Sequence, residues 1–312
     1  MTEFTAAHFD EVCNSGPVRD QIASIEAIRS KAVKQFWLFL IGGLVATAVL
    51  AIVAANFASW LGGLLFFVGV VASIVMAMRP LDKARHGLKL PMLQALAERG
   101  GMSFAHDRFE PPYYLAARKA LFGNWLSNQD FSDLFEGKDA DGKGFAFYEA
   151  HLQQGSGKNR TTVFQGQMYG FETAGGGAVT VITPDKGLFN FFKPGKDMQR
   201  VKFETHPEFE KKFEVYSTDP AAAQGMLGSP TLRNRLLEMR ARGRLFGYVD
   251  GQQALFAITG RDRFEPGSMF RASAGTERAR LMFDDVCAAL ATIKELKAAF
   301  GGSSRWTREE VA

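Results

Sequence analysis

The sequence predicts an α+β protein. We expect an N-terminal transmembrane helical hairpin, then a mostly antiparallel β-sheet domain with flanking helices and a long C-terminal helix. Three observations support this class. Residues 36–78 contain no charged side chain. Several extended apolar runs are separated by short turns, which favours antiparallel pairing. Helical patterns are grouped between and after these runs, as in α+β domains.

Composition sets the first limits. The chain has 312 residues, a formal net charge of +4 and 46% hydrophobic residues. It is therefore too apolar for a disordered chain and long enough for one or two folded units. Cys13 and Cys287 lie near opposite ends and form no CxxC motif, which predicts reduced thiols rather than a disulfide framework. The first residues, MTEFTAAHFDEV, are mixed and acidic, unlike a secretory signal.

The uncharged stretch has the length of two membrane spans. A bilayer core about 30 Å thick requires about 20 helical residues. Residues 36–55 and 60–78 each provide such a run, and Asn56 and Ser59 are in the short break between them. Because one helix of the whole length would exceed any bilayer, we expect a transmembrane helical hairpin over residues 36–78.

Small residues recur at four-residue spacing in both spans, which lets helix backbones approach closely in lipid. In an antiparallel hairpin, Gly43 and Thr47 would fall near Ser73 and Gly69. We therefore expect the two small-residue ridges to meet. The residues predicted to pack the hairpin are Gly43, Thr47, Ala51, Gly69, Ser73 and Ala77.

Basic residues flank both outer ends of the hairpin, whereas the turn has no charge. The flanking cations are Arg29, Lys31, Lys34, Arg79, Lys83, Arg85 and Lys89. Because Lys and Arg mark the cytoplasmic side of a span, we expect both termini and the main domain to be cytoplasmic, with only the turn on the other face of the membrane. Neither span contains an ionisable residue, which argues against a transporter and favours an anchor.

The rest of the chain divides around the hairpin. A helix is predicted to begin near Pro17 and to run directly into the first span. A juxtamembrane helix continues the second span and ends at Gly100-Gly101. The predicted parts are a cytoplasmic amphipathic region at 1–35, the juxtamembrane helix at 79–101, the cytoplasmic α+β domain at 102–300 and a polar tail at 301–312.

Turn residues divide the α+β domain into elements. A short helix is expected after Pro111-Pro112, and residues 127–135 are expected to be irregular or briefly helical. Predicted strands are residues 145–153, 161–171, 178–183, 188–192 and 209–217. Predicted later elements are helices at 221–227 and 231–242, a hairpin of strands 245–249 and 254–259, and the C-terminal helix at 276–300.

No catalytic, cofactor or metal site is predicted. The loop Gly155–Asn159 lacks the first glycine and the Ser/Thr of a phosphate-binding loop, and a strand follows it. The turn at Asp139–Gly144 has Lys143 where a calcium loop needs an oxygen ligand. The histidines lack metal-ligand spacing, and no GxSxG motif occurs. We therefore interpret these residues as turns and strand positions and do not predict an enzyme.

The candidate binding residues are basic. They lie on and just after the helix predicted at 231–242, and they are Arg233, Arg235, Arg240, Arg242 and Arg244. Near a membrane surface each such cation would gain about 1 kcal/mol from anionic headgroups. An acidic protein partner and an ordinary solvated helix face are the alternatives. Nucleic acid is not expected, because the patch has no interleaved aromatic residues.

Three segments resemble a bacterial domain-of-unknown-function family. They are TTVFQGQMYGFE at 161–172, FEVYSTDPAAAQGML at 213–227 and RFEPGSMF at 263–270. Members look like two-span inner-membrane proteins with a cytoplasmic α+β domain. The resemblance therefore implies that architecture here, and it implies no activity, cofactor or catalytic residue.

Together these observations predict a membrane-anchored cytoplasmic binding or scaffold module. Its expected contacts are a membrane protein partner or anionic lipid, and the sequence is also compatible with a homo-oligomer. The alternative is an enzyme of unrecognised type with a cytoplasmic active site, which would need a pocket holding a perturbed carboxylate or histidine. A transporter component is the least favoured reading.

Overall fold

The computed structural model describes residues 6–14, 16–173, 177–185, 195, 197–271 and 275–301. These residues form two compact units. The hairpin unit comprises the described residues of Phe4–Leu96 and Phe264–Asp285. The sheet unit comprises the described residues of Ala97–Arg263 and of the chain from Val286. The strand predicted at 188–192 lies outside the described residues.

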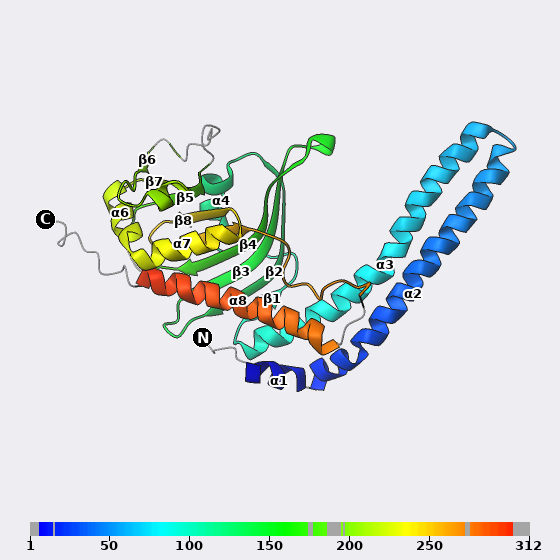
Figure 1. Ribbon diagram of the computed structural model, residues 1–312, viewed down its shortest axis with the longest axis horizontal. Helices are drawn as coiled ribbons and strands as arrows, with labels where there is room; N and C mark the ends of the chain where they lie inside the picture. The colour runs from blue at the N-terminus through cyan, green and yellow to red at the C-terminus, as the bar shows by residue number, and fades with distance from the viewer. Residues whose placement is uncertain are drawn as a thin grey trace. The chain divides into compact units, whose positions relative to one another are not determined.

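Long helices dominate the hairpin unit (Figure 1). Helix α1 spans Ala6–Asn14, α2 spans Gly16–Ala55 and α3 begins at Ser59 and ends at Arg99. The backbone N–H groups of Phe57 and Ala58 both donate to the carbonyl of Ala54, which closes a tight turn between α2 and α3. Each long helix continues beyond the uncharged stretch, as predicted, whereas α1 was not predicted as a separate helix.

The sheet unit is built on one antiparallel sheet (Figure 1). In the described residues it has nine strands in the order β1-β2-β3-β4-β9-β8-β5-β7-β6. Every strand pairing is antiparallel. The strands are β1 Ser103–Ala105, β2 Leu126–Lys138, β3 Gly144–Gln154, β4 Thr161–Glu172, β5 Thr180–Pro184, β6 Gln199–Val201, β7 Phe213–Ser217, β8 Leu245–Val249 and β9 Gln253–Thr259.

Helices are grouped as an α+β fold requires. They are α4 Tyr114–Phe122, the 3-10 turn η1 Gly157–Asn159, α5 Pro207–Glu210, α6 Pro220–Gly228, α7 Pro230–Arg242 and α8 Gly275–Gly301. The predicted α+β class, with two apolar N-terminal helices and a long C-terminal helix, is confirmed.

Both faces of the sheet are packed. Because side chains alternate along a strand, Tyr148 and Leu152 of β3 point to one face, where they share a core cluster with Leu121 of α4. On the other face Phe171 of β4 and Phe256 of β9 contact Phe300 of α8, with ring centroids 5.6 and 5.7 Å apart. The C-terminal helix therefore covers the sheet face opposite to α4.

The expectation that residues 127–135 are irregular is wrong, because they belong to β2. Polar residues such as Asn128 and Asp130 hide the strand pattern in the sequence. Pairing with β3 supplies the ladder, with a register shift between Ser132 and Phe135. At that shift Asp133 has a φ of 56°, and a bulge of this kind breaks the two-residue period.

The strand predicted at 209–217 is too long. Pro207 begins the short helix α5, which ends at Glu210, so β7 starts only at Phe213. Proline favours the first turn of a helix because its fixed φ suits the helical backbone, and because an N–H group at that position would have no partner within the helix. The three-residue strands β1 and β6 are too short to have left a pattern.

Candidate functional site

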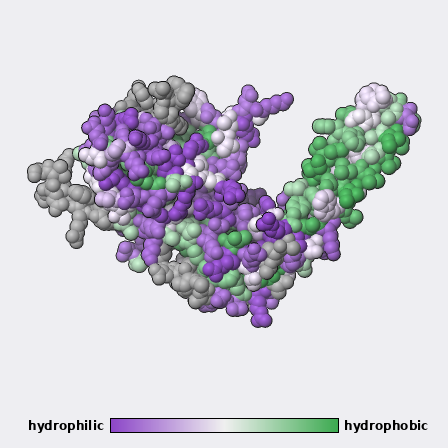
Figure 2. Space-filling model, viewed as in Figure 1, coloured by the Kyte–Doolittle hydropathy of each residue, from purple (hydrophilic) through white to green (hydrophobic). Residues whose placement is uncertain are grey.

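Helices α2 and α3 are long and apolar enough to cross a membrane, by length and composition. Only 11% of the most apolar window of α2 is buried, and 17% of that of α3. Leu38, Ile52 and Phe67 are 67–69% exposed. Figure 2 shows the resulting apolar surface over the hairpin. Soluble proteins rarely expose so much contiguous apolar surface.

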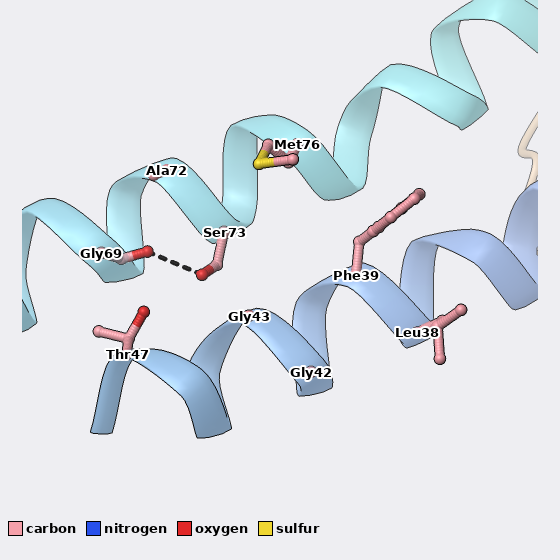
Figure 3. A pocket seen from close by; sticks show the side chains of 9 residues that line it. All are labelled: Leu38, Phe39, Gly42, Gly43, Thr47, Gly69, Ala72, Ser73 and Met76. Atoms are coloured by element: carbon pink, nitrogen blue, oxygen red, sulfur yellow. Dashed lines mark hydrogen bonds between the residues drawn. The ribbon is translucent and has the colours of Figure 1, made fainter. Parts of the chain in front are cut away.

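Small residues bring α2 and α3 into contact (Figure 3). A Cβ atom on Gly43 would lie 2.5 Å from Ser73 Oγ, and one on Gly69 would overlap with the Thr47 side chain. Ser73 Oγ donates to the carbonyl of Gly69 at 2.7 Å, so this hydroxyl is satisfied within its own helix. Ala51 and Ala77, like Thr47 and Ser73, are buried. The close approach thus depends on glycine at two points.

Beside this contact the two helices leave a groove of about 420 Å³. Its lining is apolar except for the hydroxyls of Thr47 and Ser73. A Cβ atom added to Gly42 would meet nothing within 4 Å, so the groove has room beside this residue. The lining residues are Leu38, Phe39, Gly42, Gly43, Thr47, Gly69, Ala72, Ser73 and Met76.

Aromatic side chains mark both ends of the apolar part of the hairpin. Phe36 makes edge contacts with Trp37 and with Phe270, with ring centroids 5.2 and 5.0 Å apart. At the turn, Phe57 and Trp60 are 84% and 70% exposed. Aromatic residues at both ends of an apolar helix are typical of membrane interfaces.

A segment between β9 and α8 packs on the base of the hairpin. We call Phe264–Arg271 the strap. Met269 is buried in a cluster with Ile25 of α2 and Leu81 of α3. Its carbonyl accepts a 3.0 Å hydrogen bond from Nη1 of Arg29, which is also buried. A side chain of α2 therefore holds the backbone of the strap.

Arg278 holds the strap from α8. Its side chain is buried, and Nη1 donates to the carbonyl of Pro266 at 2.7 Å. Nη2 donates to the carbonyls of Ser268 and Arg271 at 3.0 and 2.5 Å. Burial lowers the pKa of the Arg278 guanidinium from its ordinary value, but arginine stays protonated in proteins. One cation thus satisfies three backbone carbonyls of the same segment.

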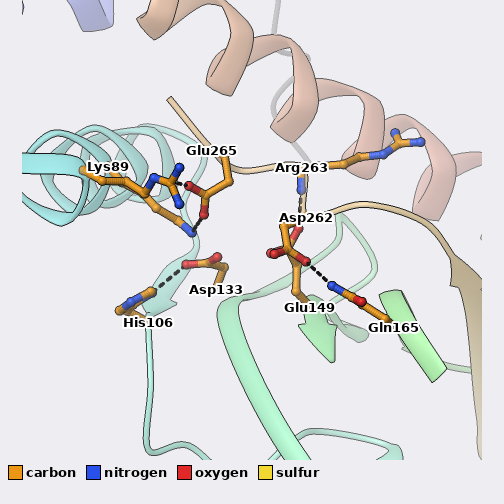
Figure 4. Close-up of polar contacts among 9 residues, drawn as sticks. Lys89, His106, Asp133, Glu149, Gln165, Asp262, Arg263 and Glu265 are labelled. Carbon is orange, nitrogen blue, oxygen red and sulfur yellow. Dashed lines mark hydrogen bonds and ion pairs between the residues drawn. The ribbon is translucent and has the colours of Figure 1, made fainter. Parts of the chain in front are cut away.

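Glu265 adds an ionic contact between the strap and α3 (Figure 4). Its Oε1 lies 2.6 Å from Lys89 Nζ, and its Oε2 lies 3.5 Å from Arg85 Nε. Only 4% of the Lys89 side chain is exposed. Sequence reasoning used these two cations only as orientation signals and missed the strap. Their flanking position predicts a membrane side but carries no information about a carboxylate so distant in the chain.

The sheet unit contains buried polar side chains on neighbouring strands (Figure 4). Asp133 of β2 is fully buried, and its Oδ1 lies 2.7 Å from His106 Nδ1. Glu149 of β3 accepts a 2.6 Å hydrogen bond from the backbone N–H of Arg263. Gln167 of β4, the cross-strand partner of Glu149, accepts from the tyrosine hydroxyl two residues later. Each of these groups makes at least one of these contacts, which offsets part of the cost of its burial.

The structure gives the first two predicted basic residues internal partners. Arg233 is buried and donates to the carbonyls of Leu227 and Gly228, at 2.8 and 2.6 Å. These carbonyls are at the end of α6, where the helix supplies no partner for them. Arg235 pairs with Glu238 and with Glu295 of α8. Both arginines hold helices together.

The other three basic residues lie at the end of α7 and beyond. Arg240 is partly buried and donates to the carbonyl of Gly243 at 3.4 Å. Arg242 and Arg244 are exposed. The Arg244 guanidinium lies 5.9 Å from the centroid of the Phe246 ring. Arg244 Nη2 also donates to the carbonyl of Val163 at 3.3 Å. Because of their exposure, Arg242 and Arg244 are the two of the five predicted cations that an external ligand can contact.

The remaining candidates have ordinary structural roles. Gly155–Asn159 is the tip of the β3–β4 hairpin. Asp139 Oδ1 accepts from the N–H groups of Asp141 and Lys143, which closes the turn before β3. Burial raises the pKa of the Cys13 thiol to about 11, so this thiol is protonated at neutral pH. Within the described residues, no group of three or more His, Cys, Asp or Glu could hold a metal ion.

Comparison with known proteins agrees with the predicted resemblance. Residues 162–298 match a family described as protein of unknown function (DUF3137). The chain is also similar to a crystal structure of the mycobacterial trehalose monomycolate transport factor A, TtfA, with 12% sequence identity and a TM-score of 0.37. That match covers 67% of this chain and 97% of the other. No curated protein matches the sequence.

Proposed function

We propose that this protein is a membrane-anchored binding or scaffold module of the bacterial inner membrane. The α2–α3 hairpin is the anchor, and the sheet unit lies in the cytoplasm, where it contacts a membrane protein partner or anionic lipid. The observation that carries this proposal is the exposed apolar surface of α2 and α3.

Energetics support a lipid environment for that surface. Exposing one large apolar side chain to water costs about 1.5–3 kcal/mol relative to burying it. Both helices expose such side chains along their apolar length, and their backbone groups bond within the helix, as lipid requires. A core helix of a soluble protein would instead be mostly buried.

Charge supports the cytoplasmic location of the sheet unit. Between Glu26 and Glu98 the chain has seven Lys and Arg residues and one acidic residue, Asp82. All seven cations lie outside residues 36–78, and none lies in the turn. The two basic flanks therefore favour the same, cytoplasmic side.

Thiol labelling tests the anchor and its orientation. Cys13 and Cys287 are replaced by serine, and Ser59→Cys at the turn or Ser127→Cys in the sheet unit is added; both serines are exposed. In intact cells a membrane-impermeant maleimide should label the Ser59→Cys variant only. Labelling of the Ser127→Cys variant without permeabilisation would show that the sheet unit lies on the opposite side of the membrane. Recovery of the protein in the soluble fraction would contradict the proposal that α2 and α3 anchor it in the membrane.

Crosslinking in cells tests the binding function. Full-length protein is crosslinked and captured, and so is the variant with Arg242→Glu and Arg244→Glu. A matched control carries Lys158→Glu and Arg160→Glu at the exposed tip of the β3–β4 hairpin. We expect one membrane partner that the control retains and the Arg242/Arg244 variant loses. Recovery of only bulk protein from all three would contradict the scaffold function and favour the search for an enzymatic activity.

A further inference from the structure

We propose that the groove between α2 and α3 binds one anionic phospholipid. An acyl chain lies along the groove, and the headgroup phosphate is held by Lys34 and Arg79. This inference rests on the proposed membrane anchoring, and it adds a site, a ligand class and a recognition mechanism.

The shape and chemistry of the groove suit a hydrocarbon chain. Figure 3 shows Leu38 and Met76 toward one end of the groove and Thr47 and Gly69 toward the other. The Ser73 hydroxyl donates to its own helix, so it makes no demand on a polar ligand. The groove therefore offers apolar contacts along its length, which is what an acyl chain requires.

Helical spacing places two cations beyond the Leu38 and Met76 end of this groove. Lys34 lies four residues before Leu38 on α2, and Arg79 lies three residues after Met76 on α3. Residues at these spacings are neighbours on one helix face. Both cations are exposed, and neither forms a salt bridge within the described residues. Long basic side chains at a span end can reach the headgroup region while their stems lie along apolar surface.

An apolar groove with two cations at one end favours a phospholipid with net negative charge. The cations belong to flanks with seven basic residues and one acidic residue, so an anionic headgroup is favoured over a zwitterionic one. Exposed Trp37, at the same end of the span, is typical of the headgroup level. A transmembrane helix of a partner would fill the groove but would leave the two cations without an anion.

Native mass spectrometry of the full-length protein tests the site. The probes are phosphatidylglycerol and phosphatidylcholine with identical acyl chains, titrated into detergent-purified protein. We expect one bound phosphatidylglycerol at concentrations where phosphatidylcholine does not bind. Lys34→Gln and Arg79→Gln should each weaken phosphatidylglycerol binding about fivefold, which corresponds to about 1 kcal/mol per cation. Arg19→Gln removes an exposed cation five helical turns from Leu38 and should change nothing.

A glycine pair tests the groove itself. Gly42→Leu fills the groove, and Gly63→Leu adds the same side chain to α3 outside it; neither position has a neighbour within 4 Å of an added Cβ. The Gly42→Leu variant should lose the bound lipid, and the Gly63→Leu variant should keep it. Equal affinity for both lipids, equal binding by the two leucine variants, or a protein dimer that excludes lipid would overturn the proposal.

Flotation of the same samples with liposomes separates the two proposals. If wild-type protein inserts into liposomes but shows no preference for phosphatidylglycerol, the lipid site is wrong and the anchor stands. If it does not insert, the anchoring itself is wrong.

Discussion

Lys89 Nζ and Glu265 Oε1 lie 2.6 Å apart, although 176 positions separate these residues in the sequence. Only 4% of the Lys89 side chain is exposed, against 28% for Glu265. An ammonium group so far from water requires an anionic partner. The pair therefore ties the strap to helix α3, whereas hydrogen bonds from Arg29 and Arg278 tie it to α2 and to α8.

Removing the Glu265 charge should release the strap. Glu265→Gln removes the negative charge from one contact of the buried Lys89 ammonium, at an expected cost of about 1–3 kcal/mol. Hydrogen–deuterium exchange of the detergent-solubilised protein should then show faster exchange in residues 264–271. Asp284→Asn breaks an exposed pair with Arg280 and is the control, with no expected change in the strap. Unchanged exchange after Glu265→Gln would show that the ion pair does not hold the strap.

Packing of the hairpin should depend on Gly43 and not on Gly63. A leucine at position 43 must displace Ser73, because even its Cβ would lie 2.5 Å from Ser73 Oγ. We expect a destabilisation of about 1–3 kcal/mol, as for other overpacked contacts. Thermal denaturation in detergent, with Gly63→Leu as the matched control, measures it. Equal denaturation temperatures for the two variants would mean that the close approach of α2 and α3 contributes little.

Arg233 should stabilise the sheet unit although it was predicted to bind a ligand. Arg233→Met leaves the carbonyls of Leu227 and Gly228 without their donor, and we expect a loss of about 1–3 kcal/mol. Arg242→Met changes an exposed side chain and should alter stability by less than about 0.5 kcal/mol. Urea unfolding of full-length protein in detergent, followed by tryptophan fluorescence, compares the two. A larger loss from Arg242→Met would contradict the assigned roles.

Acid should weaken the Asp139–Lys297 contact. Burial raises the pKa of Asp139, but hydrogen bonds from Lys297 and from the backbone of Lys143 outweigh it, so the pKa lies below its ordinary value. A carboxyl group with a lowered pKa in the folded state adds stability above its unfolded pKa of about 3.9 and loses it as pH falls further. The stability difference between wild type and Lys297→Met should therefore be constant from pH 5 to 7 and shrink below about pH 4.

Urea midpoints measured across this pH range give the comparison. Arg280→Met, which removes a cation from an exposed pair, is the control for general charge effects. A difference between wild type and Lys297→Met that stays constant down to pH 2.5 would refute the assignment to Asp139.

Elements with strong local signals were predictable. The hairpin helices follow from 43 consecutive uncharged residues, and β3, β4, β8 and β9 follow from extended apolar runs between glycine-rich turns. In these segments the local pattern and the tertiary environment favour the same structure. β2 was missed because its polar residues and its bulge obscure the two-residue period, so that only pairing with β3 defines it.

The candidate sites divide in the same way. Two apolar spans between basic flanks can be inferred from the sequence, because span length and flanking charge are properties of a continuous segment. The roles of the cations follow only from the folded structure. Arg233, Lys89 and Arg278 are buried against carbonyls or a carboxylate, whereas Arg242 and Lys34 are exposed. A charged side chain takes its role from the groups that the fold places within about 3 Å of it. For Arg233, Lys89 and Arg278 those groups belong to other elements than the one that carries the cation.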